Sequence, residues 1–370
     1  MNKVICLYDG CCANYDERSI YLGLGGSESW IVYISEALAR ISNTHILIYC
    51  NCNDWHIHSK YKNIEYLPHN YFYNRSEYQH YDALIISRII DEDAIEIIKN
   101  TKCCNNIYII SHDICIRYFN KEFINEFFYK DLINDEWLTK SIKKIFCLSK
   151  WHKQYLIDYY GFPDNLLEIT KYGLNEDLLN INKNVKRDNN IFWSNRIERN
   201  FNLLVENIAP LIIKEIPDFK IYCAFYDEIP DEYKYLLDYE YVINLGKLGK
   251  QQLYEEMSKH KCYFYPSLFA ETFCMTCIEH IMCDVQLIMP LRYGPETIFE
   301  PYKYLFMNQI WFENENDIEY AASKIIEAMN TYYNPDKIVL RQSIKEYLIN
   351  EYNWDCIAQE LYKKMMIFYK

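Results

Sequence analysis

The chain has 370 residues, 50% of them hydrophobic and 17% aromatic, so it can form more than one hydrophobic core. At about 100–200 residues per domain, this length predicts two domains, or three. The formal net charge of −13 argues against non-specific nucleic-acid binding, because the phosphate backbone requires a basic protein surface.

The 15 cysteines are spread along the chain, mostly in apolar runs, where a reduced thiol packs as a small hydrophobic group. This distribution differs from the regular spacing of small secreted disulfide frameworks. The start of the chain lacks the layout of a signal peptide, and no apolar run approaches the ~18 residues that would span a membrane. We therefore expect a protein of the reducing cytoplasm.

In the first half of the chain, short apolar runs rich in β-branched or aromatic residues alternate with amphipathic segments. Strands are expected at residues 3–9, 44–50, 81–87, 106–111 and 144–149. Helices are expected at residues 27–42 and 91–100. This alternation is typical of a parallel sheet with helices on both faces.

A polar stretch at residues 180–190 contains several Asn and charged residues and predicts a linker, which we place at 171–190. The alternation then restarts. Strands are expected at residues 191–196, 219–225, 241–246, 262–267, 285–290 and 304–312. Helices are expected at residues 200–216, 249–260, 316–330 and 353–368. The chain is thus predicted to be α/β, with two doubly wound halves facing a cleft, and ligands are expected beyond the carboxyl ends of the strands.

A glycine-rich loop separates the first predicted strand from the first predicted helix. Gly25 and Gly26 would let the backbone approach a ligand closely, and Ser27 could cap the helix, whose first amides would face an anion. The spacing is not that of the dinucleotide-binding G-x-G-x-x-G motif. A flexible loop followed by a capped helix explains the same pattern equally well.

His112 and Asp113 come directly after a predicted strand. A histidine there can donate to a substrate oxygen or accept a proton. Arg196 lies at the end of another predicted strand, and Arg199 follows three residues later. Two arginines separated by a short turn can converge on a diphosphate. The structural alternatives are a satisfied core histidine and a surface arginine paired with Glu198.

The stretch from Ser267 to Cys283 contains two glutamates, Glu271 on a predicted loop and Glu279 in the helix that follows. They can share a ligand only if the chain turns between them, as it does at a strand–loop–helix corner. The free amides at the helix start would then meet phosphate. Cys274 and Cys277 form a C-x-x-C, but no second pair stands at zinc-finger spacing, so zinc is not expected.

Taken together, these motifs resemble the retaining glycosyltransferases of family 4, which have the GT-B fold of two facing Rossmann-like domains. The resemblance covers nearly the whole chain. It rests on GLGGSE (23–28), IISHD (109–113), CLSKWHKQYL (147–156), KYGLNEDLL (171–179), WSNRIERNFNLLVE (193–206) and INLGKLGKQQLYEEMSKHKCYFYPSLFAETF (243–273), followed by the E-x7-E of ETFCMTCIE (271–279). An E-x7-E alone is a weak signal, but its position behind YPS and downstream of the arginine pair makes it specific.

The resemblance implies roles for single residues. Residues expected at the reacting centre are His112, Arg196, Arg199 and Glu271. Residues expected to contact substrates are Gly25, Gly26, Ser27, Asp113, Gly246, Leu248, Thr272, Phe273, Cys274, Met275 and Glu279. The arginines would hold the donor diphosphate with amides near Phe273, Glu279 would hold the ribose, and Gly246 and Leu248 would lie near the base. Cys274, Met275 and Thr276 depart from the Gly, aliphatic residue and Pro that are usual in this family.

The resemblance also implies a domain plan and an activity. Residues 1–170 would form the acceptor-side domain, residues 191–345 the nucleotide-sugar domain, and residues 346–370 a helix that packs back on the first domain. The expected reaction moves a sugar from a nucleotide diphosphate sugar to an acceptor hydroxyl with retention of configuration, without a cofactor or a metal. UDP-sugars are favoured over GDP-sugars, and the acceptor would be a glycan, a lipid-linked molecule or another hydroxyl compound.

Two other activities are kept as alternatives: an inactive nucleotide-sugar-binding subunit, and a GT-B-like epimerase or phosphorylase. Lysines 140, 143, 144, 150 and 153 form a local basic cluster in this acidic chain. The cluster could touch an anionic membrane that carries a lipid-linked acceptor, although a solvated helix face explains it more simply. We therefore keep peripheral contact with the cytosolic face of a membrane as an option.

Overall fold

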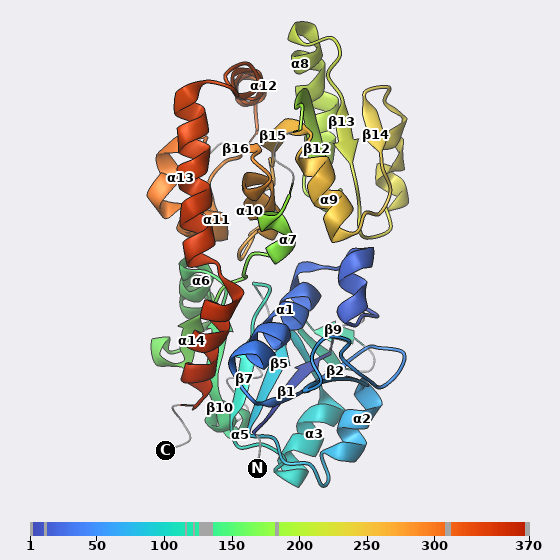
Figure 1. Cartoon of the computed structure of the whole chain (residues 1–370), viewed down its shortest axis with the longest axis vertical. Coiled ribbons are helices and arrows are strands. Elements are labelled where there is room, and N and C mark those ends of the chain that lie inside the picture. The colour runs from blue at the N-terminus through green and yellow to red at the C-terminus, as the bar shows by residue number, and fades with distance from the viewer. Residues whose placement is uncertain are drawn as a thin grey trace.

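The computed structural model describes residues 3–10, 13–114, 117–120, 123–125, 136–181, 185–307 and 312–366 (Figure 1). It consists of two α/β halves, each built on its own largely parallel sheet. This is the predicted fold class. The parts of the predicted linker, of the strand at 304–312 and of the last helix that fall on residues 182–184, 308–311 and 367–368 lie outside the described residues.

The first sheet has eight strands in the order β11-β10-β7-β5-β1-β2-β4-β3. The strands are β1 (Val4–Asp9), β2 (His45–Cys50), β3 (His56–Ile57), β4 (Ile64–Pro68), β5 (Ala83–Ser87), β7 (Ile107–Ile110), β10 (Ile142–Cys147) and β11 (Leu167–Ile169). Neighbouring strands are parallel, except for the antiparallel pair β3–β4. β4 was not predicted, because Glu65 and Pro68 interrupt its apolar pattern.

Helices cover both faces of this sheet. They are η1 (Glu17–Leu22), α1 (Gly26–Ile41), α2 (His69–Arg75), α3 (Glu92–Thr101), α5 (Glu136–Ser141), α6 (Lys150–Tyr160) and η2 (Asp164–Leu166). A second, three-stranded sheet has the order β6-β8-β9, with β6 (Ile89–Asp91), β8 (Arg117–Asn120) and β9 (Phe123–Asn125).

The two-residue period of β1 explains why both faces are covered. Ile5 and Leu7 belong to the core cluster that includes α1, whereas Cys6 and Tyr8 belong to the cluster on the opposite face. Successive side chains of a strand point to opposite faces, so a strand that is apolar at every position needs a partner layer on each side.

The second sheet has five parallel strands in the order β14-β13-β12-β15-β16. The strands are β12 (Asp188–Trp193), β13 (Ile221–Cys223), β14 (Val242–Asn244), β15 (His260–Phe264) and β16 (Gln286–Ile288). The helices of the second half and the chain end are α7 (Glu176–Leu179), η3 (Leu203–Ile208), α8 (Ala209–Glu215), η4 (Asp231–Asp238), α9 (Lys250–Met257), α10 (Met275–Met282), α11 (Tyr293–Ile298), η5 (Glu300–Leu305), α12 (Glu315–Asn330), α13 (Pro335–Glu351) and α14 (Trp354–Met366).

Two predicted boundaries in the second half differ from the structure. β12 begins at Asp188, inside the stretch assigned to the linker, and the preceding Arg187 is buried. The Arg187 guanidinium donates to the carbonyls of His260 at 2.9 Å and Cys283 at 2.7 Å, so polar residues of the stretch anchor the strand. α13 also runs past the predicted boundary at residue 345 and ends at Glu351.

The predicted strand at residues 304–312 is wrong over its described part. Glu300–Leu305 form a 3₁₀ helix with Pro301 in its first turn, and Met307 makes an isolated bridge to Pro290. Proline supplies a backbone angle that suits the start of a helical turn. Tyr304 is 74% exposed, whereas Met307 belongs to the core cluster and Leu305 and Phe306 pack against it, so the run is only partly buried.

The chain passes between the two halves at two places that lie against each other. The Leu174 amide donates to the Tyr352 carbonyl at 2.6 Å, and the Gly173 backbone packs on the Trp354 indole. After the second crossing, α14 lies along α1 of the first half (Figure 1). The Tyr108 hydroxyl donates to the Met365 carbonyl at 2.8 Å, which ties α14 to the first sheet.

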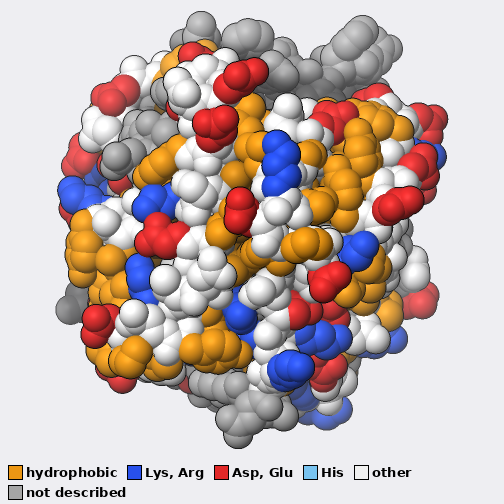
Figure 2. Space-filling model, turned by 90° about the horizontal axis from the view of Figure 1, so that it is seen from above, with side chains coloured by type: hydrophobic (Ala, Val, Ile, Leu, Met, Phe, Trp, Pro, Cys, Tyr) orange, Lys and Arg blue, Asp and Glu red, His pale blue; other side chains and the backbone are white. Residues whose placement is uncertain are grey.

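Basic side chains on the surface lie close to acidic ones. On the described part of the face in Figure 2, acidic and basic side chains are interspersed with apolar ones. Within the basic cluster, Lys140, Lys144, Lys150 and Lys153 each pair with a carboxylate, at 2.7–3.2 Å. These pairs favour the solvated-face interpretation of that cluster.

Two further expectations concern membranes and cysteines. None of the described helices combines the length and the apolar character needed to cross a bilayer. The cysteines of the described ranges are free thiols, and all of them except Cys356 are buried.

Candidate functional site

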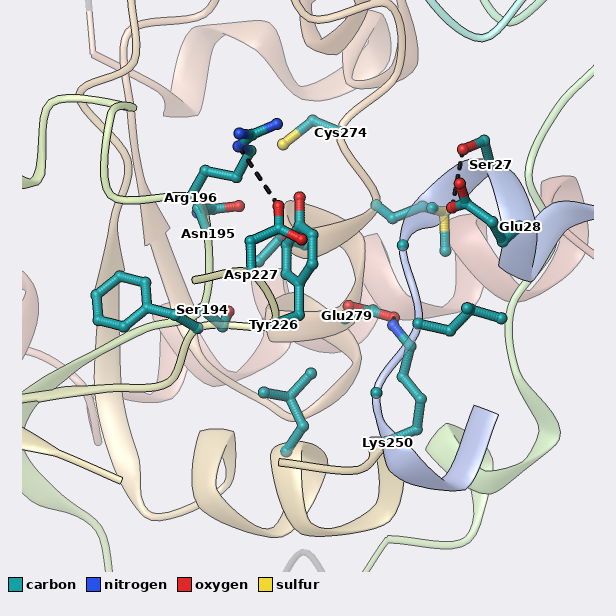
Figure 3. A pocket seen from close by; sticks show the side chains of 18 of the residues that line it. Ser27, Glu28, Ser194, Asn195, Arg196, Tyr226, Asp227, Lys250, Cys274 and Glu279 are labelled. Atoms are coloured by element: carbon teal, nitrogen blue, oxygen red, sulfur yellow. Dashed lines mark hydrogen bonds and ion pairs between the residues drawn. The ribbon is translucent and has the colours of Figure 1, made fainter. Parts of the chain in front are cut away.

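A cleft of about 710 Å³ lies between the two halves, lined by residues that follow strand ends of both sheets (Figure 3). The loops after β1, β5 and β7 form one wall, and the loops after β12, β13, β14 and β15 form the other. Of the residues predicted to act, the cleft brings together Gly25, Gly26, Ser27, His112, Asp113, Arg196, Arg199, Leu248, Glu271, Thr272, Phe273, Cys274, Met275 and Glu279.

Gly246 is the predicted site residue that does not line the cleft. It has a positive φ of 71°, and a Cβ built there would meet nothing within 4 Å. It therefore serves the turn after β14. Leu248 does line the cleft, and its carbonyl lies against Gly23 of the first half, where an added Cβ would come within 2.8 Å.

The glycine-rich loop ends one residue earlier than predicted. α1 begins at Gly26 with Gly25 as its N-cap, so the prediction that Ser27 caps the helix is wrong. The Ser27 hydroxyl instead donates to Glu28 Oε2 at 2.9 Å and accepts from Arg88 at 2.9 Å. A Cβ on Gly25 would lie 2.5 Å from Glu28 Oε2, so the end of that side chain would have to shift.

Arg88 connects the residues of this wall, a role that its sequence motif did not predict. It follows β5 directly and has a positive φ of 57°. Its guanidinium bonds Asp113 at 3.0 Å and pairs with Glu28 at 3.4 Å. The strand-end rule that selected His112 applies equally to Arg88 and could have found it.

His112 is a neutral imidazole in the cleft wall. Burial, assisted by the charges of Arg88 and His152, lowers its pKa well below 6.5. Its Nδ1 lies 2.8 Å from the Tyr172 hydroxyl, whose pKa burial raises well above 10, so that the hydroxyl keeps its proton. Tyr172 donates no other hydrogen bond that the structure records. We therefore assign its proton to Nδ1, which leaves the His112 proton on Nε2.

His112 also links the two halves of the molecule. The Thr272 hydroxyl, from the loop after β15, donates to the His112 carbonyl at 2.6 Å. The Phe273 ring lies 5.2 Å from the Tyr172 ring, centroid to centroid. These contacts place the loop before α10 against the first wall, so residues from both halves face one volume.

Arg196 projects into the cleft from the loop after β12 (Figure 3). Its side chain is 48% exposed and pairs with Glu198 at 3.3 Å and with Asp227 at 3.6 Å. Burial would lower its pKa, but the nearby negative charges raise it, so it stays cationic. The predicted pairing with Glu198 is therefore present, and it coexists with a position inside the cleft.

Arg199 is held more rigidly than Arg196. Its guanidinium lies over the Phe269 ring, 3.1 Å from the centroid, and its Nη1 is 3.9 Å from Glu271 Oε1. That Nη1 is buried and has no hydrogen-bond partner in the described part of the chain. Buried donors in folded proteins are nearly always satisfied, so an exception in a cleft wall points to a missing acceptor.

Glu271 lies between Arg199 and Tyr265. The Tyr265 hydroxyl donates to Glu271 Oε1 at 2.6 Å. Burial raises the pKa of Glu271 above 4.5, and the charge of Arg199 and the Tyr265 hydrogen bond oppose that rise. The carboxyl group is thus held in the lining of the cleft.

The N-terminus of α10 opens into the cleft, as the corner after β15 predicted. Cys274 is the N-cap, with a positive φ of 77°, and Met275 and Thr276 form the first turn. All three line the cleft. The first amides of a helix have no intrahelical acceptor and favour an anion.

Glu279 lies one turn further along α10 and has partners of its own. Its Oε1 accepts from Lys250 at 2.6 Å and from the Tyr254 hydroxyl at 3.0 Å. The predicted hydrogen bonds from a ribose would have to share this carboxylate with Lys250, which also lines the cleft (Figure 3). Lys250 begins α9, and the sequence analysis gave it no role.

Among the residues that the structure describes, three buried donors in the cleft wall have no hydrogen-bond partner: His112 Nε2, Ser194 Oγ and Arg199 Nη1. They come from both halves of the molecule. Outside the cleft lining, Asp16, Glu17 and His56 bring three metal-ligand atoms within 4.8 Å of one another. Arg18 already bonds Asp16, and the His56 ring lies 2.8 Å from Glu17, so protein groups satisfy that cluster.

The second half of the chain resembles a known protein family in sequence. Residues 175–349 match the model of the glycosyl transferases group 1 family. Among curated proteins, none matches the chain in sequence.

Solved structures share the fold at low identity. A glycosyltransferase from Rickettsia africae ESF-5 has a TM-score of 0.66 at 14% identity, with 100% of both chains covered. Sucrose-phosphate synthase from Thermosynechococcus elongatus has a TM-score of 0.66 at 13% identity, covering 100% of this chain and 99% of that one. Anabaena HepE in complex with UDP has a TM-score of 0.64 at 11% identity, covering 98% and 99%.

The family match supports sugar transfer, and these neighbours share the fold. Residues 175–349 are thus similar in sequence to the glycosyl transferases group 1, within a chain that has the GT-B fold.

Proposed function

We propose that the protein is a retaining glycosyltransferase that moves a sugar from a nucleotide diphosphate sugar, with UDP-sugars favoured, to an acceptor hydroxyl. The observation that carries this proposal is the buried, unsatisfied Nη1 of Arg199 in a cleft that also contains Arg196 and the α10 N-terminus. A pyrophosphate supplies acceptor oxygens to all three. The UDP complex of Anabaena HepE, which has the same fold, supports this choice of ligand.

The pairing of Arg196 does not prevent this role. Solvent-exposed ion pairs contribute about 0.2–1 kcal/mol, and Arg196 is about half exposed. A doubly charged diphosphate, bound bidentately, would replace Glu198 and Asp227 at little cost. In this proposal Arg196 turns toward the ligand, whereas Arg199 is already positioned by Phe269.

The same groups would stabilise the leaving group. Negative charge grows on the nucleoside diphosphate as the bond to the sugar breaks, and two guanidiniums and the helix amides would stabilise it without a metal. A donor phosphate oxygen would take the acceptor proton on the face from which the leaving group departs, which retains configuration. His112 Nε2–H would donate to a sugar hydroxyl, and Glu271 would accept from another.

The competing activities are an inactive nucleotide-sugar binder and an epimerase. Glu279 is paired with Lys250, and Arg196 is paired with two carboxylates. These ion pairs favour a protein that binds a nucleotide sugar without turnover. Binding of a donor without turnover on any acceptor, or in water, would support it. Conversion of the donor sugar without an acceptor would support an epimerase.

The first test is a screen of intact UDP-, GDP-, ADP- and dTDP-sugars by thermal shift and by release of the nucleoside diphosphate. We expect UDP-sugars to raise the melting temperature most. If none of the four classes stabilises the protein or releases product, nucleotide-sugar transfer is wrong.

The second test uses Arg196→Ala. We expect the rate of nucleoside diphosphate release to fall by about tenfold or more, which corresponds to about 1.4 kcal/mol of lost stabilisation. Arg75→Ala is the control, because Arg75 pairs with Glu65 away from the cleft lining. A rate within tenfold of wild type would remove Arg196 from the diphosphate site.

A further inference from the structure

Two thiols meet at the start of α10. Cys274 Sγ lies 3.1 Å from Cys277 Sγ, and both thiols are free. Cys274 is the N-cap of the helix and Cys277 its third residue. Side chains at these two positions face each other across the first turn, as they do in a capping box. A disulfide between them needs the sulfurs to move only about 1 Å closer.

The pair is reachable from one side. Cys274 lines the cleft and projects into it (Figure 3), whereas Cys277 lies behind it with no exposed surface. A reagent in the cleft would therefore meet Cys274 first, and Cys277 could then attack the sulfur of Cys274. Such an order suits a pair with one attacking and one resolving thiol.

The backbone of Cys274 adds a second observation. Its φ of 77° lies in the left-handed region, which costs a non-glycine residue about 1–2 kcal/mol. Residues held in this region concentrate at functional sites. Apolar packing accounts for Cys277, whose sulfur also contacts the Met289 thioether at 3.5 Å, but it does not require a cysteine at the strained, cleft-facing position.

We propose that Cys274 and Cys277 are a redox modification site in the wall of the cleft, and that a low-molecular-weight disulfide oxidises them to an intramolecular disulfide.

The chemistry is a pair of thiol–disulfide exchanges. The Cys274 thiolate attacks one sulfur of the oxidant, which forms a mixed disulfide and releases the first small thiol. Burial raises the pKa of the Cys277 thiol well above 9, so this thiol loses its proton as its sulfur attacks Cys274 Sγ, which breaks the mixed disulfide and releases the second small thiol. Two electrons pass from the protein sulfurs to the oxidant, and the two released thiols carry the two protons.

The effect of this disulfide on nucleotide binding rests on the proposed function. A free Cys274 thiol can rotate about χ1 away from an incoming phosphate oxygen, whereas a bridged sulfur is held in one position. The disulfide would therefore fix a sulfur atom beside the helix amides that are proposed to bind the diphosphate. Oxidation is expected to weaken nucleotide binding, and a bound nucleotide is expected to slow oxidation by the same linkage.

The first experiment maps the disulfide. The full chain carrying Cys356→Ser, which removes the exposed thiol of the described ranges, is incubated with oxidised glutathione, alkylated and digested, and its peptides are identified by mass spectrometry. We expect a peptide bridged between Cys274 and Cys277, and glutathione attached to Cys274 in the Cys277→Ala variant. Reduced or glutathionylated Cys274 in the intact pair, with no bridge, overturns the proposal.

The second experiment measures UDP binding by calorimetry before and after oxidation. We expect the dissociation constant to rise about tenfold or more in the parent, equal to about 1.4 kcal/mol, and the addition of dithiothreitol to reverse the change. Cys283→Ala is the matched control, since it removes another buried cysteine next to α10 and leaves the pair intact. It should respond like the parent. If the dissociation constant for UDP is unchanged in protein that fully carries the Cys274–Cys277 disulfide, the proposed effect of oxidation on nucleotide binding is wrong.

The two experiments separate this inference from the proposed function. Failure of the reduced protein to bind UDP counts against the proposed function, whereas the peptide map decides the disulfide by itself.

Discussion

Tyr172 shows how a single hydroxyl can set the chemistry of a neighbouring side chain. It lies where the chain leaves the first half, and its hydroxyl donates to His112 Nδ1, which keeps the single imidazole proton on Nε2. Because the pKa of His112 is well below 6.5, the imidazole acts as a neutral donor at physiological pH.

We expect Tyr172→Phe to lower kcat about tenfold and to leave the KM for the donor little changed, because the loss of one buried hydrogen bond frees the tautomer without touching the diphosphate site. Steady-state release of nucleoside diphosphate measures both constants. Tyr302→Phe, which removes a hydroxyl bonded to Ser343, is the control. Equal kcat values for the two variants would contradict the assignment.

At this scale, the sequence predicted residues that follow strands better than it predicted helix caps. His112, Arg196 and Glu271 follow buried strands, and all three line the cleft. Ser27 was wrongly assigned as a cap because Gly25 and Gly26 both permit the helix to begin earlier, and sequence alone does not choose between adjacent starts. Tyr172 and Lys250 were missed because their roles depend on contacts between segments far apart in the chain.

Among the elements, β12, α9 and β15 meet at a buried histidine. The two ring nitrogens of His260 lie 2.8 Å from Asp188 Oδ1 and 3.3 Å from Glu256 Oε1. Burial alone would lower the pKa of His260, but the hydrogen bonds and charges of the two carboxylates raise it above 6.5. A histidine whose pKa is higher in the folded than in the unfolded state stabilises the fold at pH values below its unfolded pKa. This stabilisation is lost as the pH rises through the folded pKa.

We expect His260→Gln to reduce the free energy of unfolding by about 1.5–3 kcal/mol at about pH 6, the contribution of hydrogen bonds to charged groups. The difference from wild type should shrink as the pH rises past the folded pKa. Urea denaturation across this range measures it. His80→Gln replaces an exposed histidine and should show neither effect. If the difference in free energy of unfolding between the variant and wild type grows with pH, the predicted direction of the pH dependence is wrong.

The contact between η1 and α9 depends on one glycine. A Cβ on Gly249 would lie 1.9 Å from the Tyr21 carbonyl oxygen and 2.9 Å from its carbon. Both are rigid backbone atoms, so any side chain at this position would push the two halves apart along this edge of the cleft.

We expect Gly249→Ala to cost about 1–3 kcal/mol, as overpacked contacts do, unless η1 moves away. Hydrogen exchange of the η1 amides should therefore become faster, and UDP affinity should fall. Mass spectrometry of deuterated peptides measures the exchange. Gly26→Ala is the steric control, because its Cβ would meet the Tyr172 hydroxyl at an ordinary 3.6 Å. Unchanged exchange in Gly249→Ala would show that the contact is not tight in solution.

For the whole molecule, α14 connects the end of the second half to the first. Leu361 is 2% exposed in a helix that packs on α1, whereas its neighbour Glu360 is exposed. We expect Leu361→Ala to lower the free energy of unfolding by about 2–5 kcal/mol and Glu360→Ala to change it little, as measured by urea denaturation. Similar effects of the two variants would mean that α14 is not docked on α1.

The fold as a whole was predictable from the sequence, because short apolar runs that alternate with amphipathic segments allow few arrangements. The strand predicted at residues 304–312 was wrong over 304–307 because an apolar run looks like a strand in sequence, although here Tyr304 is exposed and lies in a helical turn. The position of α14 came from the family resemblance, since local periodicity carries no information on which half a terminal helix covers.

The paired crossing at Leu174 and Tyr352 has a consequence for motion. Two adjacent chain segments joined by a hydrogen bond form a pivot, which permits rotation about one line and resists sliding of one half along the other. The cleft would then open by rotation of one half about this pivot. A distance probe between Tyr21 and Gly249, at the far edge, would change with ligand, whereas a probe between Asn175 and Asn353, beside the pivot, would hardly change.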